Sequence, residues 1–377
     1  MGSSRTRYDG IPCSMLTQAH ALLSAHTTLR LGGPARELVV AERELEILDV
    51  LGARGRDRGE PLLVLGGGSN VVVGDLGFPG TVLKIATRGL IFEGSPRGEE
   101  ALVTAQAGEP WDDLVAECVE RGLAGIECLS GIPGLVGAVP MQNVGAYGQD
   151  VSETLISLRA FDRERGQVVR FAHADCRFGY RTSVFRGSER HTLLEVTFRL
   201  RRGGLSGPLR YAELCRALGV PPGAGAPLAR VRDAVLALRR AKGMVLSSDD
   251  PDSVSAGSFF TNPVLSAEAL AEASRRVSER TSAASMPQYP DGEGRTKLSA
   301  AWLIEQAGFH RGLARGPVSL SRKHTLALVN SGGGTARELL ALADEIRRGV
   351  WQAFGVWLEP EPVLVGVTPP WAAPDEP

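Results

Sequence analysis

The chain has 377 residues, of which 43% are hydrophobic and 23% charged, and its formal net charge is -1. This length is enough for two or three domains with separate cores, and the balanced charge excludes a broad electrostatic attraction to nucleic acid or membrane surfaces. Five scattered cysteines without a CxxC pair argue against a zinc site or a disulfide framework. No apolar run approaches the length of a membrane helix. We therefore predict a cytoplasmic protein with no nucleic-acid partner, no membrane insertion and no obligatory protein partner.

The N-terminal part predicts a βαβ-like pattern. After a flexible tail over residues 1–18, we expect a strand at 37–40, a helix around 45–51 and an apolar strand at 62–65. Further short strands follow at 71–73 and 82–85. The glycine run that begins at Gly66 leads into β-branched residues and not into a helix, which distinguishes it from the Rossmann fingerprint.

The middle part predicts mostly strands. A strand from residue 101 ends at Gly108, and Pro110 suits the first turn of a helix with Trp111 on its apolar face. The segments 155–161 and 168–171 are expected to form a hairpin, and 192–200 another strand.

A Pro-, Gly- and Ala-rich stretch at 221–227 predicts a seam between domains. Beyond it we expect helices near 228–241, 266–277 and 298–307 and a strand at 325–329. Thr335 and Glu338 form a capping-box pattern that opens a long helix, and Gly355 is a suitable terminator. Residues 356–365 then read as a strand, and the tail after Thr368 as disordered.

Two glycine-rich segments are candidates for phosphate binding. Residues 66–70 have the sequence GGGSN after a strand, so their backbone amides can approach a pyrophosphate closely. Taken alone, this motif is equally compatible with a plain glycine-rich hairpin. Residues 130–148 combine five glycines with retained apolar side chains, which favours a backbone lining a flat ring system and a phosphate chain over a structural loop.

Three later segments each offer one group for charge or proton chemistry. Arg181 can hold a carboxylate in bidentate fashion, although a lone arginine more commonly forms a surface ion pair. Ser258 can deliver a proton if its surroundings stabilise the alkoxide, but alone it reads as a turn serine, and no GxSxG context surrounds it. Glu359 and Glu361 lie two apart on the expected strand and would face one side, either as a catalytic carboxyl or as solvated carboxylates.

From about His26 to Gly366 the chain resembles the UDP-N-acetylenolpyruvoylglucosamine reductase family, flavoenzymes of peptidoglycan precursor synthesis. Eight blocks in family order carry the resemblance, at residues 66–70, 131–137, 142–148, 178–181, 239–242, 257–263, 297–306 and 357–361. Each block is weak alone, whereas eight in order over most of the chain are specific.

The resemblance implies an α+β fold with a two-part FAD-binding region of the vanillyl-alcohol-oxidase type and a C-terminal α+β substrate-binding domain. On this basis we expect FAD-binding subdomains at 19–87 and 88–225 and a substrate-binding domain at 226–355. Residues 356–377 would supply a closing strand with the catalytic glutamate and a disordered tail.

The resemblance also implies an activity, the NADPH-dependent reduction of UDP-N-acetylglucosamine enolpyruvate to UDP-N-acetylmuramate. Non-covalently held FAD would be bound by Gly66, Gly67, Gly68, Ser69, Asn70, Ser130, Gly131, Ile132, Gly134, Gly137, Asn143, Gly145, Ala146 and Arg239. The sugar nucleotide or NADPH would be contacted by Tyr180, Tyr211, Lys242, Asn262 and His324. Arg181 and Glu361 would polarise the enolpyruvyl carboxylate and Ser258 would donate the proton, with no metal involved.

Two features depart from the long form of the family, which covers its substrate with a tyrosine loop. His324 stands where some members have glutamine, and the 203–208 segment before Tyr211 is rich in glycine and serine. Two other functions remain as alternatives: a related FAD-dependent oxidase and a non-catalytic nucleotide-binding regulator. An oxidase of this kind gives no reason for the blocks GSFFTNP (residues 257–263) and EPE (residues 359–361). The presence of Arg181, Ser258 and Glu361 together disfavours the regulator.

Overall fold

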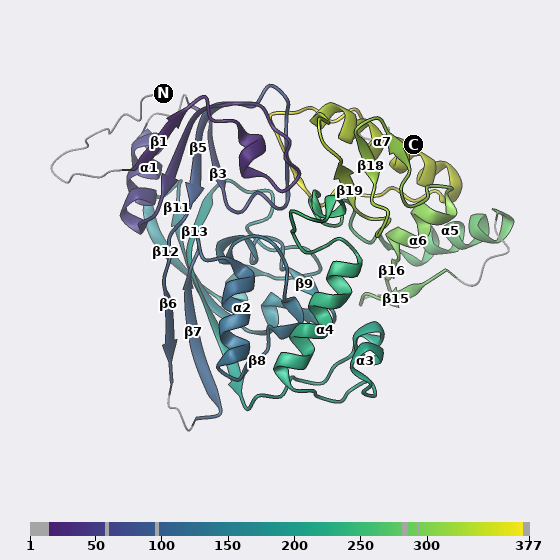
Figure 1. Cartoon of the computed structure of the whole chain (residues 1–377), viewed down its shortest axis with the longest axis horizontal. Coiled ribbons are helices and arrows are strands. Elements are labelled where there is room, and N and C mark those ends of the chain that lie inside the picture. The colour runs from purple at the N-terminus through teal and green to yellow at the C-terminus, as the bar shows by residue number, and fades with distance from the viewer. Residues whose placement is uncertain (1–14, 57–59, 95–97, 281–285, 293, 372–377) are drawn as a thin grey trace. The chain divides into compact units, whose positions relative to one another are not determined.

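The computed structural model describes residues 15–56, 60–94, 98–280, 286–292 and 294–371 (Figure 1). The chain divides into two compact units. Unit 1 takes in residues up to 21, 35–68 and 79–241, and unit 2 takes in 22–34, 69–78 and the chain from 242 onward. This division does not follow the expected domain boundaries one for one, because the helix predicted at 228–241 belongs to unit 1.

The larger sheet of unit 1 is antiparallel and centred on the long strand β13 (His191–Arg202). Strand β13 pairs with β11 (Leu155–Asp162) on one side and with β7 (Glu100–Gln106) on the other. The sheet is completed by β12 (Gln167–Ala172), β6 (Leu90–Glu93) and β8 (Leu123–Ala124). The pairing of β11 with β12 confirms the predicted hairpin.

The smaller sheet of unit 1 has the order β1-β2-β5-β3 and carries α1 (Glu44–Arg56). Its strands are β1 (Leu16–Ala19), β2 (Ala35–Ala41), β5 (Phe78–Ile85) and β3 (Leu62–Leu65). Pairing of β3 with β5 is parallel. The expectation of a loose tail up to residue 18 is wrong at its end, because β1 pairs with β2; residues 1–14 lie outside the described part.

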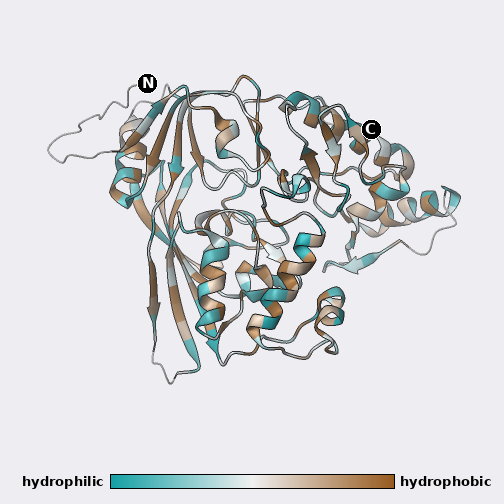
Figure 2. Ribbon diagram, viewed as in Figure 1, coloured by the Kyte–Doolittle hydropathy of each residue, from teal (hydrophilic) through white to brown (hydrophobic). Residues whose placement is uncertain are grey.

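Three helices and several short elements complete unit 1. The helices are α2 (Trp111–Glu120), α3 (Ala212–Leu218) and α4 (Leu228–Ala241). Both α2 and α4 carry hydrophobic and hydrophilic residues, as expected of helices with one buried face (Figure 2). The short elements are β9 (Gly145–Ala146), β10 (Gln149–Asp150), η2 (Glu127–Leu129), η3 (Val136–Ala138), η4 (Val151–Glu153) and η5 (His173–Cys176).

Unit 2 is built around α7 (Ala336–Phe354), whose apolar residues join one large buried cluster. Thr335 accepts a hydrogen bond from the Glu338 N–H at 3.1 Å, and the Glu338 carboxylate accepts one from the Thr335 N–H at 2.9 Å. Gly355 ends the helix in the left-handed conformation, with φ of 71°. The predicted capping box and terminator are therefore confirmed.

The remaining elements of unit 2 are short. Its other helices are α5 (Ala267–Arg280), α6 (Ala300–Gln306), η1 (Leu23–His26) and η6 (Pro251–Ser253). Two three-stranded sheets have the orders β14-β16-β15 and β17-β18-β19. Their strands are β14 (Val264–Leu265), β16 (Thr296–Leu298), β15 (Gln288–Pro290), β17 (Ala314–Arg315), β18 (Val318–Leu320) and β19 (Leu328–Asn330).

Two expectations for the C-terminal segment are corrected. The predicted strand at 356–365 is reduced to β20 (Val363–Val365), which pairs in parallel with β4 (Val71–Val73). Pro360 and Pro362 interrupt the rest, because proline has no N–H to donate to a ladder. The tail after Thr368 is ordered at least to Trp371, which packs against the core of unit 2, while residues 372–377 lie outside the described part.

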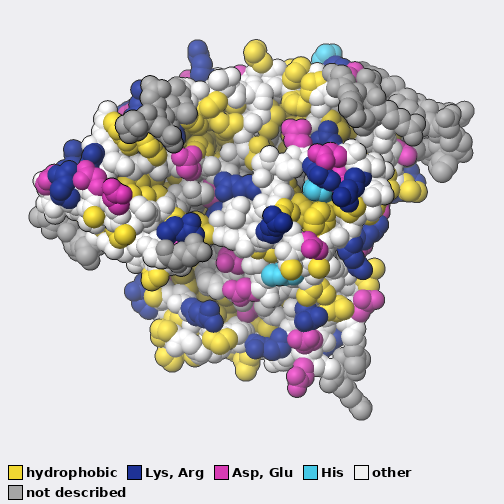
Figure 3. Space-filling view, turned by 180° about the vertical axis from the view of Figure 1, so that it is seen from behind, with side chains coloured by type: hydrophobic (Ala, Val, Ile, Leu, Met, Phe, Trp, Pro, Cys, Tyr) yellow, Lys and Arg dark blue, Asp and Glu magenta, His cyan; other side chains and the backbone are white. Residues whose placement is uncertain are grey.

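On the face seen in Figure 3, basic and acidic side chains are interspersed. Within the described ranges, no helix combines the length and apolarity that crossing a bilayer requires.

Candidate functional site

The two predicted glycine loops pack against each other within unit 1. A Cβ atom added at Gly67 would lie only 2.8 Å from the Gly134 Cα, so the backbones touch where any side chain would separate them. Gly68, Gly131 and Gly134 have positive φ values of 65°, 71° and 121°, which only glycine adopts without strain. The converging loops present backbone at close range, which fits the pyrophosphate and ring system of FAD.

An aspartate that the sequence analysis did not single out anchors the second loop. Asp112, in the first turn of α2, accepts hydrogen bonds from the Gly131 N–H at 2.6 Å and from both terminal nitrogens of Arg232 at 2.6 and 2.9 Å. Burial acts to raise the pKa of Asp112, but these hydrogen bonds and the nearby positive charge lower it overall. No local sequence signal marks this residue, because acidic side chains are common in first turns.

Other predicted loop residues also hold the loop in place. The buried Ser130 hydroxyl donates to the Glu127 carbonyl at 2.7 Å, and the Gly137 N–H donates to the Ala107 carbonyl at 2.9 Å. A Cβ at Gly137 would lie 2.6 Å from the Ala107 Cβ. Ile132 packs against the apolar cluster of the larger sheet, and Gly66 faces the side chain of Leu135.

Arg181 lies over the turn that contains Asn143 and Gly145. Its Nη2 donates to the Gly145 carbonyl at 2.7 Å and its Nη1 to the Asn143 carbonyl at 3.4 Å. The Asn143 side chain donates to the Gly179 carbonyl at 3.1 Å and accepts from the Ser152 N–H at 3.0 Å. Arg181 and Asn143 have positive φ values of 51° and 46°, the kind of backbone strain that collects at functional sites.

Tyr211, the expected lid residue, contacts another tyrosine of the second loop. The rings of Tyr147 and Tyr211 meet edge to face with centroids 5.2 Å apart, while 43% of Tyr211 stays exposed. Burial raises the pKa of Tyr147 to about 12. Tyr180 is partly exposed beside Arg181, whose guanidinium carbon lies 5.6 Å from the centre of its ring.

Arg239 lies in the last turn of α4 in unit 1, and Ala146, the residue before Tyr147, lies in β9. Burial lowers the pKa of Arg239, and the proximity of Tyr147 and Asp112 partly opposes that shift. The guanidinium therefore belongs to the same group of side chains as the Asp112 anchor of the glycine loop.

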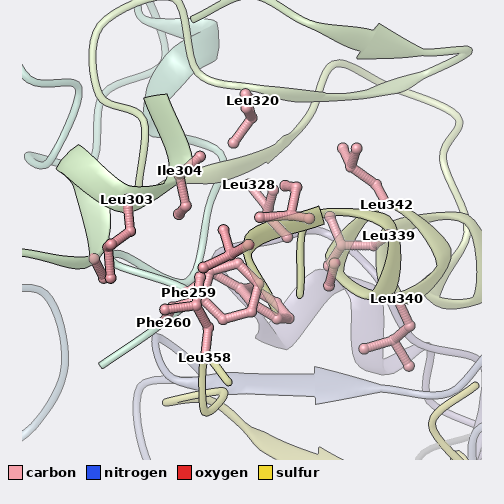
Figure 4. Close-up of a cluster of buried hydrophobic side chains, with 14 of the residues drawn as sticks. Phe259, Phe260, Leu303, Ile304, Leu320, Leu328, Leu339, Leu340, Leu342 and Leu358 are labelled. Carbon is pink, nitrogen blue, oxygen red and sulfur yellow. The ribbon is translucent and has the colours of Figure 1, made fainter. Parts of the chain in front are cut away.

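In unit 2, the segments that carry Ser258 and Glu361 are hydrogen-bonded to each other. The Glu361 N–H donates to the Phe259 carbonyl at 2.9 Å, the Thr261 N–H donates to the Glu359 carbonyl at 3.0 Å, and Phe260 pairs with Pro360. Figure 4 shows Phe259, Phe260 and Leu358 in one apolar cluster with α7 side chains. The structure thus brings together two motifs about a hundred residues apart in sequence.

The last residue of the first glycine motif, Asn70, is hydrogen-bonded to the segment that carries Glu361. Asn70 donates from Nδ2 to the Glu361 carbonyl at 3.3 Å, and its own carbonyl accepts from the Val363 N–H at 2.9 Å. Ser69 and Asn70 belong to unit 2, whereas Gly66–Gly68 belong to unit 1.

The predicted substrate residues of unit 2 lie on separate turns. The Asn262 Oδ1 accepts from the Ala300 N–H at 2.9 Å and so fixes the start of α6. His324 closes a turn in which its N–H donates to the Ser321 hydroxyl at 3.3 Å. Lys242 is partly buried immediately after α4.

A buried aspartate, also missed from the sequence, fixes the His324 turn. Asp252 accepts hydrogen bonds from the Ser321 hydroxyl at 2.9 Å and from the Arg322 N–H at 2.8 Å. A Cβ added at Gly243, the residue after Lys242, would lie only 3.0 Å from the Asp252 Cβ. Asp252 therefore links the turn before His324 to the loop after Lys242.

Two family models match separate parts of this chain. Residues 36–172 match the family model described as FAD binding domain, and residues 250–365 match the one described as UDP-N-acetylenolpyruvoylglucosamine reductase, C-terminal domain. The chain is 53% identical to UDP-N-acetylenolpyruvoylglucosamine reductase of Thermobifida fusca (strain YX) over 92% of this chain and 97% of that one. The chain belongs to the UDP-N-acetylenolpyruvoylglucosamine reductase family.

Two further relatives agree with this assignment. The enzyme of the same name from Saccharopolyspora erythraea is 54% identical over 91% of this chain and 94% of its own length. A solved UDP-N-acetylenolpyruvylglucosamine reductase from Thermus caldophilus has 25% identity and a TM-score of 0.61, covering 93% of this chain and 99% of that one. The predicted fold class, family and FAD cofactor are confirmed.

The described residues contain no group of three or more His, Cys, Asp or Glu side chains arranged to hold a metal ion. The four cysteines in the described ranges, Cys118, Cys128, Cys176 and Cys215, are all buried free thiols.

Proposed function

We propose that this protein reduces UDP-N-acetylglucosamine enolpyruvate to UDP-N-acetylmuramate with NADPH as the hydride donor, and that it does so in the cytoplasm. FAD, when bound, supplies hydride transfer between the two substrates. The observation that carries the proposal is the hydrogen-bonded pairing of the Phe259 and Glu361 segments. This pairing supports a common task for Ser258 and Glu361 within a chain of this family.

The converging glycine loops would hold FAD through their backbone. In unit 1, backbone N–H groups of Gly66, Gly67 and Gly68 and of the loop from Ser130 to Ala146 would donate to phosphate oxygens. The Asp112 carboxylate keeps the Gly131 loop in place, and Arg239 would contribute positive charge near the phosphates. Ser69 and Asn70 would also contact FAD.

Arg181 would hold the carboxylate of the enolpyruvyl group. Its guanidinium is permanently charged and is already oriented by the Gly145 and Asn143 carbonyls. As negative charge develops toward the carboxylate during hydride addition, a cation fixed beforehand stabilises it without reorganising. Glu361, in its protonated form, would stabilise the same charge.

Ser258 would complete the reaction by donating a proton to the carbon next to the carboxylate. Its segment is fixed by the Phe259 carbonyl, which accepts from Glu361, and by the Phe259 N–H, which donates to the Leu326 carbonyl at 2.7 Å. A rigid support of this kind holds a general acid within reach of its target. Tyr180, Tyr211, Lys242, Asn262 and His324 would contact the sugar nucleotide or NADPH.

An anaerobic absorbance experiment tests the proposal. The purified protein should be yellow, NADPH should bleach the flavin band, and the enolpyruvyl sugar nucleotide should restore it. Acid precipitation should release the flavin into the supernatant, because the attachment is non-covalent. Rapid recovery in air without the sugar nucleotide would favour an oxidase, and a flavin that NADPH does not reduce would favour a nucleotide-binding regulator.

A further inference from the structure

Arg347 is a cation placed on the buried face of α7. It is 3% exposed and lies next in sequence to Ile346, which is fully buried. Its neighbour Arg348 has the usual arrangement of a helix arginine, with 59% of its side chain exposed and a 2.8 Å hydrogen bond to Asp344. Burying a charge without good partners destabilises a fold, and this burial lowers the pKa of Arg347. Packing alone would be satisfied by an apolar residue.

The contacts that compensate for this burial come from the C-terminal segment. Nε of Arg347 donates to the Leu358 carbonyl at 2.7 Å. The guanidinium carbon lies 5.2 Å from the ring centre of Trp357 and 4.7 Å from that of Trp371, both within the range of cation–π attraction. Trp351 stacks on Trp357 at 5.3 Å, so the indole beside the guanidinium is itself held by α7.

The ion pair of Arg347 is weaker than these contacts. Its Nη2 lies 3.9 Å from Oε1 of Glu359, whose side chain is 70% exposed. An ion pair with this separation and this degree of solvent exposure contributes little to stability. The geometry therefore directs Arg347 to the backbone at Leu358 rather than to a carboxylate.

The Leu358 carbonyl lies three residues before Glu361, in a stretch that carries two prolines. Pro360 and Pro362 have no N–H to donate, so this stretch cannot form a regular ladder. Its backbone is held by the bonds of Glu361 with Phe259 and Asn70 and by that of Glu359 with Thr261. Arg347 supplies the anchor on the N-terminal side of this set.

We propose that Arg347 is a positioning residue for the catalytic carboxyl of Glu361, acting through the Leu358 carbonyl and supported by Trp357 and Trp371. The inference rests on the proposed function, because it requires Glu361 to act on the substrate. A shift of about 1 Å in a catalytic group can slow a reaction by about a hundredfold, so a remote anchor of this kind has a measurable effect.

The experiment compares four variants of the FAD-containing protein at a temperature well below unfolding. Arg347→Met removes the buried charge with similar volume, and Arg347→Lys restores a donor for the carbonyl. Arg348→Met is the matched control on the exposed side of the same helix, and Glu361→Gln tests the carboxyl itself. Stopped-flow absorbance measures flavin reduction by NADPH and flavin reoxidation by the sugar nucleotide separately, and hydrogen exchange measures protection of the Glu361 N–H.

We expect Arg347→Met to slow reoxidation by ten- to a hundredfold. Flavin reduction should stay within about twofold of the unchanged protein, because this half-reaction does not need the Glu361 carboxyl. In Arg347→Met, hydrogen exchange should be faster at the Glu361 N–H and unchanged at the N–H groups of β13. Arg347→Lys should recover part of the rate, and Arg348→Met should match the unchanged protein.

Other results would overturn the inference in distinguishable ways. If Glu361→Gln is slow while Arg347→Met reoxidises like Arg348→Met, the positioning role is wrong and the proposed function stands. If Glu361→Gln reoxidises normally, the proposed role of the carboxyl is wrong, and the positioning role with it. If Arg347→Met does not fold, Arg347→Lys and Trp371→Leu decide: normal rates in both would overturn the inference, and slowed reoxidation with normal reduction would support it.

Discussion

The Nδ2 of Asn70 donates a hydrogen bond to the backbone carbonyl of Glu361 at 3.3 Å, across 291 positions of sequence. The last residue of the first glycine motif is thereby joined to the residue that we propose as the catalytic carboxyl. The same asparagine accepts from the Val363 N–H, and β4 and β20 continue the contact as a parallel pair. A change in the backbone of one segment is therefore expected to reach the other.

The carboxyl proposed to act on the substrate is Glu361 rather than Glu359. We expect Glu361→Gln to slow flavin reoxidation by the sugar nucleotide by several orders of magnitude, because a positioned acid and charge stabiliser contributes about 10²–10⁴-fold alone. Glu359 is the matched control, since its side chain is 70% exposed. Stopped-flow absorbance of both variants checks the ranking, and a slower Glu359→Gln would move the assignment to that residue.

The close approach of the glycine loops gives a prediction about FAD binding. Gly67→Ala would place a methyl group 2.8 Å from the Gly134 Cα, so the loops must separate. We expect a lower melting temperature of the apoprotein and less FAD in the purified protein. Gly66→Ala is the control, because the nearest atom to its added methyl is a Leu135 side-chain carbon at 3.7 Å. Equal melting temperatures of the two apoproteins would show that the loops do not depend on this contact.

The sequence predicted best where the signals were local. The boundaries of α7 follow from Thr335, Glu338 and Gly355, each of which acts within one turn of the helix. The strand Leu62–Leu65 was likewise predicted from a short apolar run followed by glycine. The family resemblance then supplied the order of the motifs and the cofactor.

Local sequence signals could not predict contacts between residues that are distant in sequence. The pairing of Glu361 with Phe259 and of Asn70 with Glu361 depends on segments distant in sequence, and nothing near these residues encodes it. The strand expected over 356–365 failed because two prolines outweighed its apolar residues. Asp112 and Asp252 look like ordinary helix-start and loop acids, so only the fold reveals that they anchor predicted loops.

The lid role of Tyr211 depends on its contact with Tyr147. Tyr211→Ala removes an edge-to-face pair of a kind worth about 0.5–1.5 kcal/mol, so we expect the KM for the sugar nucleotide to rise by up to roughly tenfold. The flavin absorption spectrum should not change, because Tyr211 is 43% exposed and pairs with Tyr147. Tyr211→Phe retains the ring pair and should retain much of the affinity. Loss of FAD from Tyr211→Ala would place this residue in the cofactor site instead.

A buried carboxylate in the larger sheet predicts how stability depends on pH. Arg190 donates to Asp162 at 2.7 Å, and this pairing, with bonds from the Arg165 and Glu164 N–H groups, outweighs burial and lowers the pKa of Asp162 from 3.8 to about 2. A carboxyl whose folded pKa is depressed stabilises the fold above its unfolded pKa, and this contribution is lost as the pH falls from about 4 to about 2.

Asp162→Asn tests this dependence directly. The variant should have a lower free energy of unfolding than the unchanged protein at pH 5, and the difference should shrink as the pH falls toward 2. Urea titrations at several pH values measure it, with the exposed Glu120→Gln as a control. A difference that stays constant from pH 5 to pH 2.5 would mean that the pairing of Asp162 does not govern acid stability.

Ser258 provides the most specific prediction, because a proton donor acts only in the second half of the reaction. Ser258→Ala should leave flavin reduction by NADPH nearly unchanged. Binding of the sugar nucleotide should also change little, since one neutral hydrogen bond contributes about 0.5–1.5 kcal/mol. Flavin reoxidation by the sugar nucleotide should fall by about 10²–10⁴-fold, the loss expected for a missing general acid.

The conservative variant and the two half-reactions separate this role from a structural one. Ser258→Cys should recover part of the reoxidation rate, because a thiol can also deliver a proton. The backbone conformation of the segment should be retained in both variants. It is held by the hydrogen bonds of Phe259 with Glu361 and Leu326, which do not involve the serine side chain. If Ser258→Ala slows flavin reduction as much as reoxidation, the serine is structural. The proton would then have to come from elsewhere, and a water molecule held by Glu361 would be the first candidate.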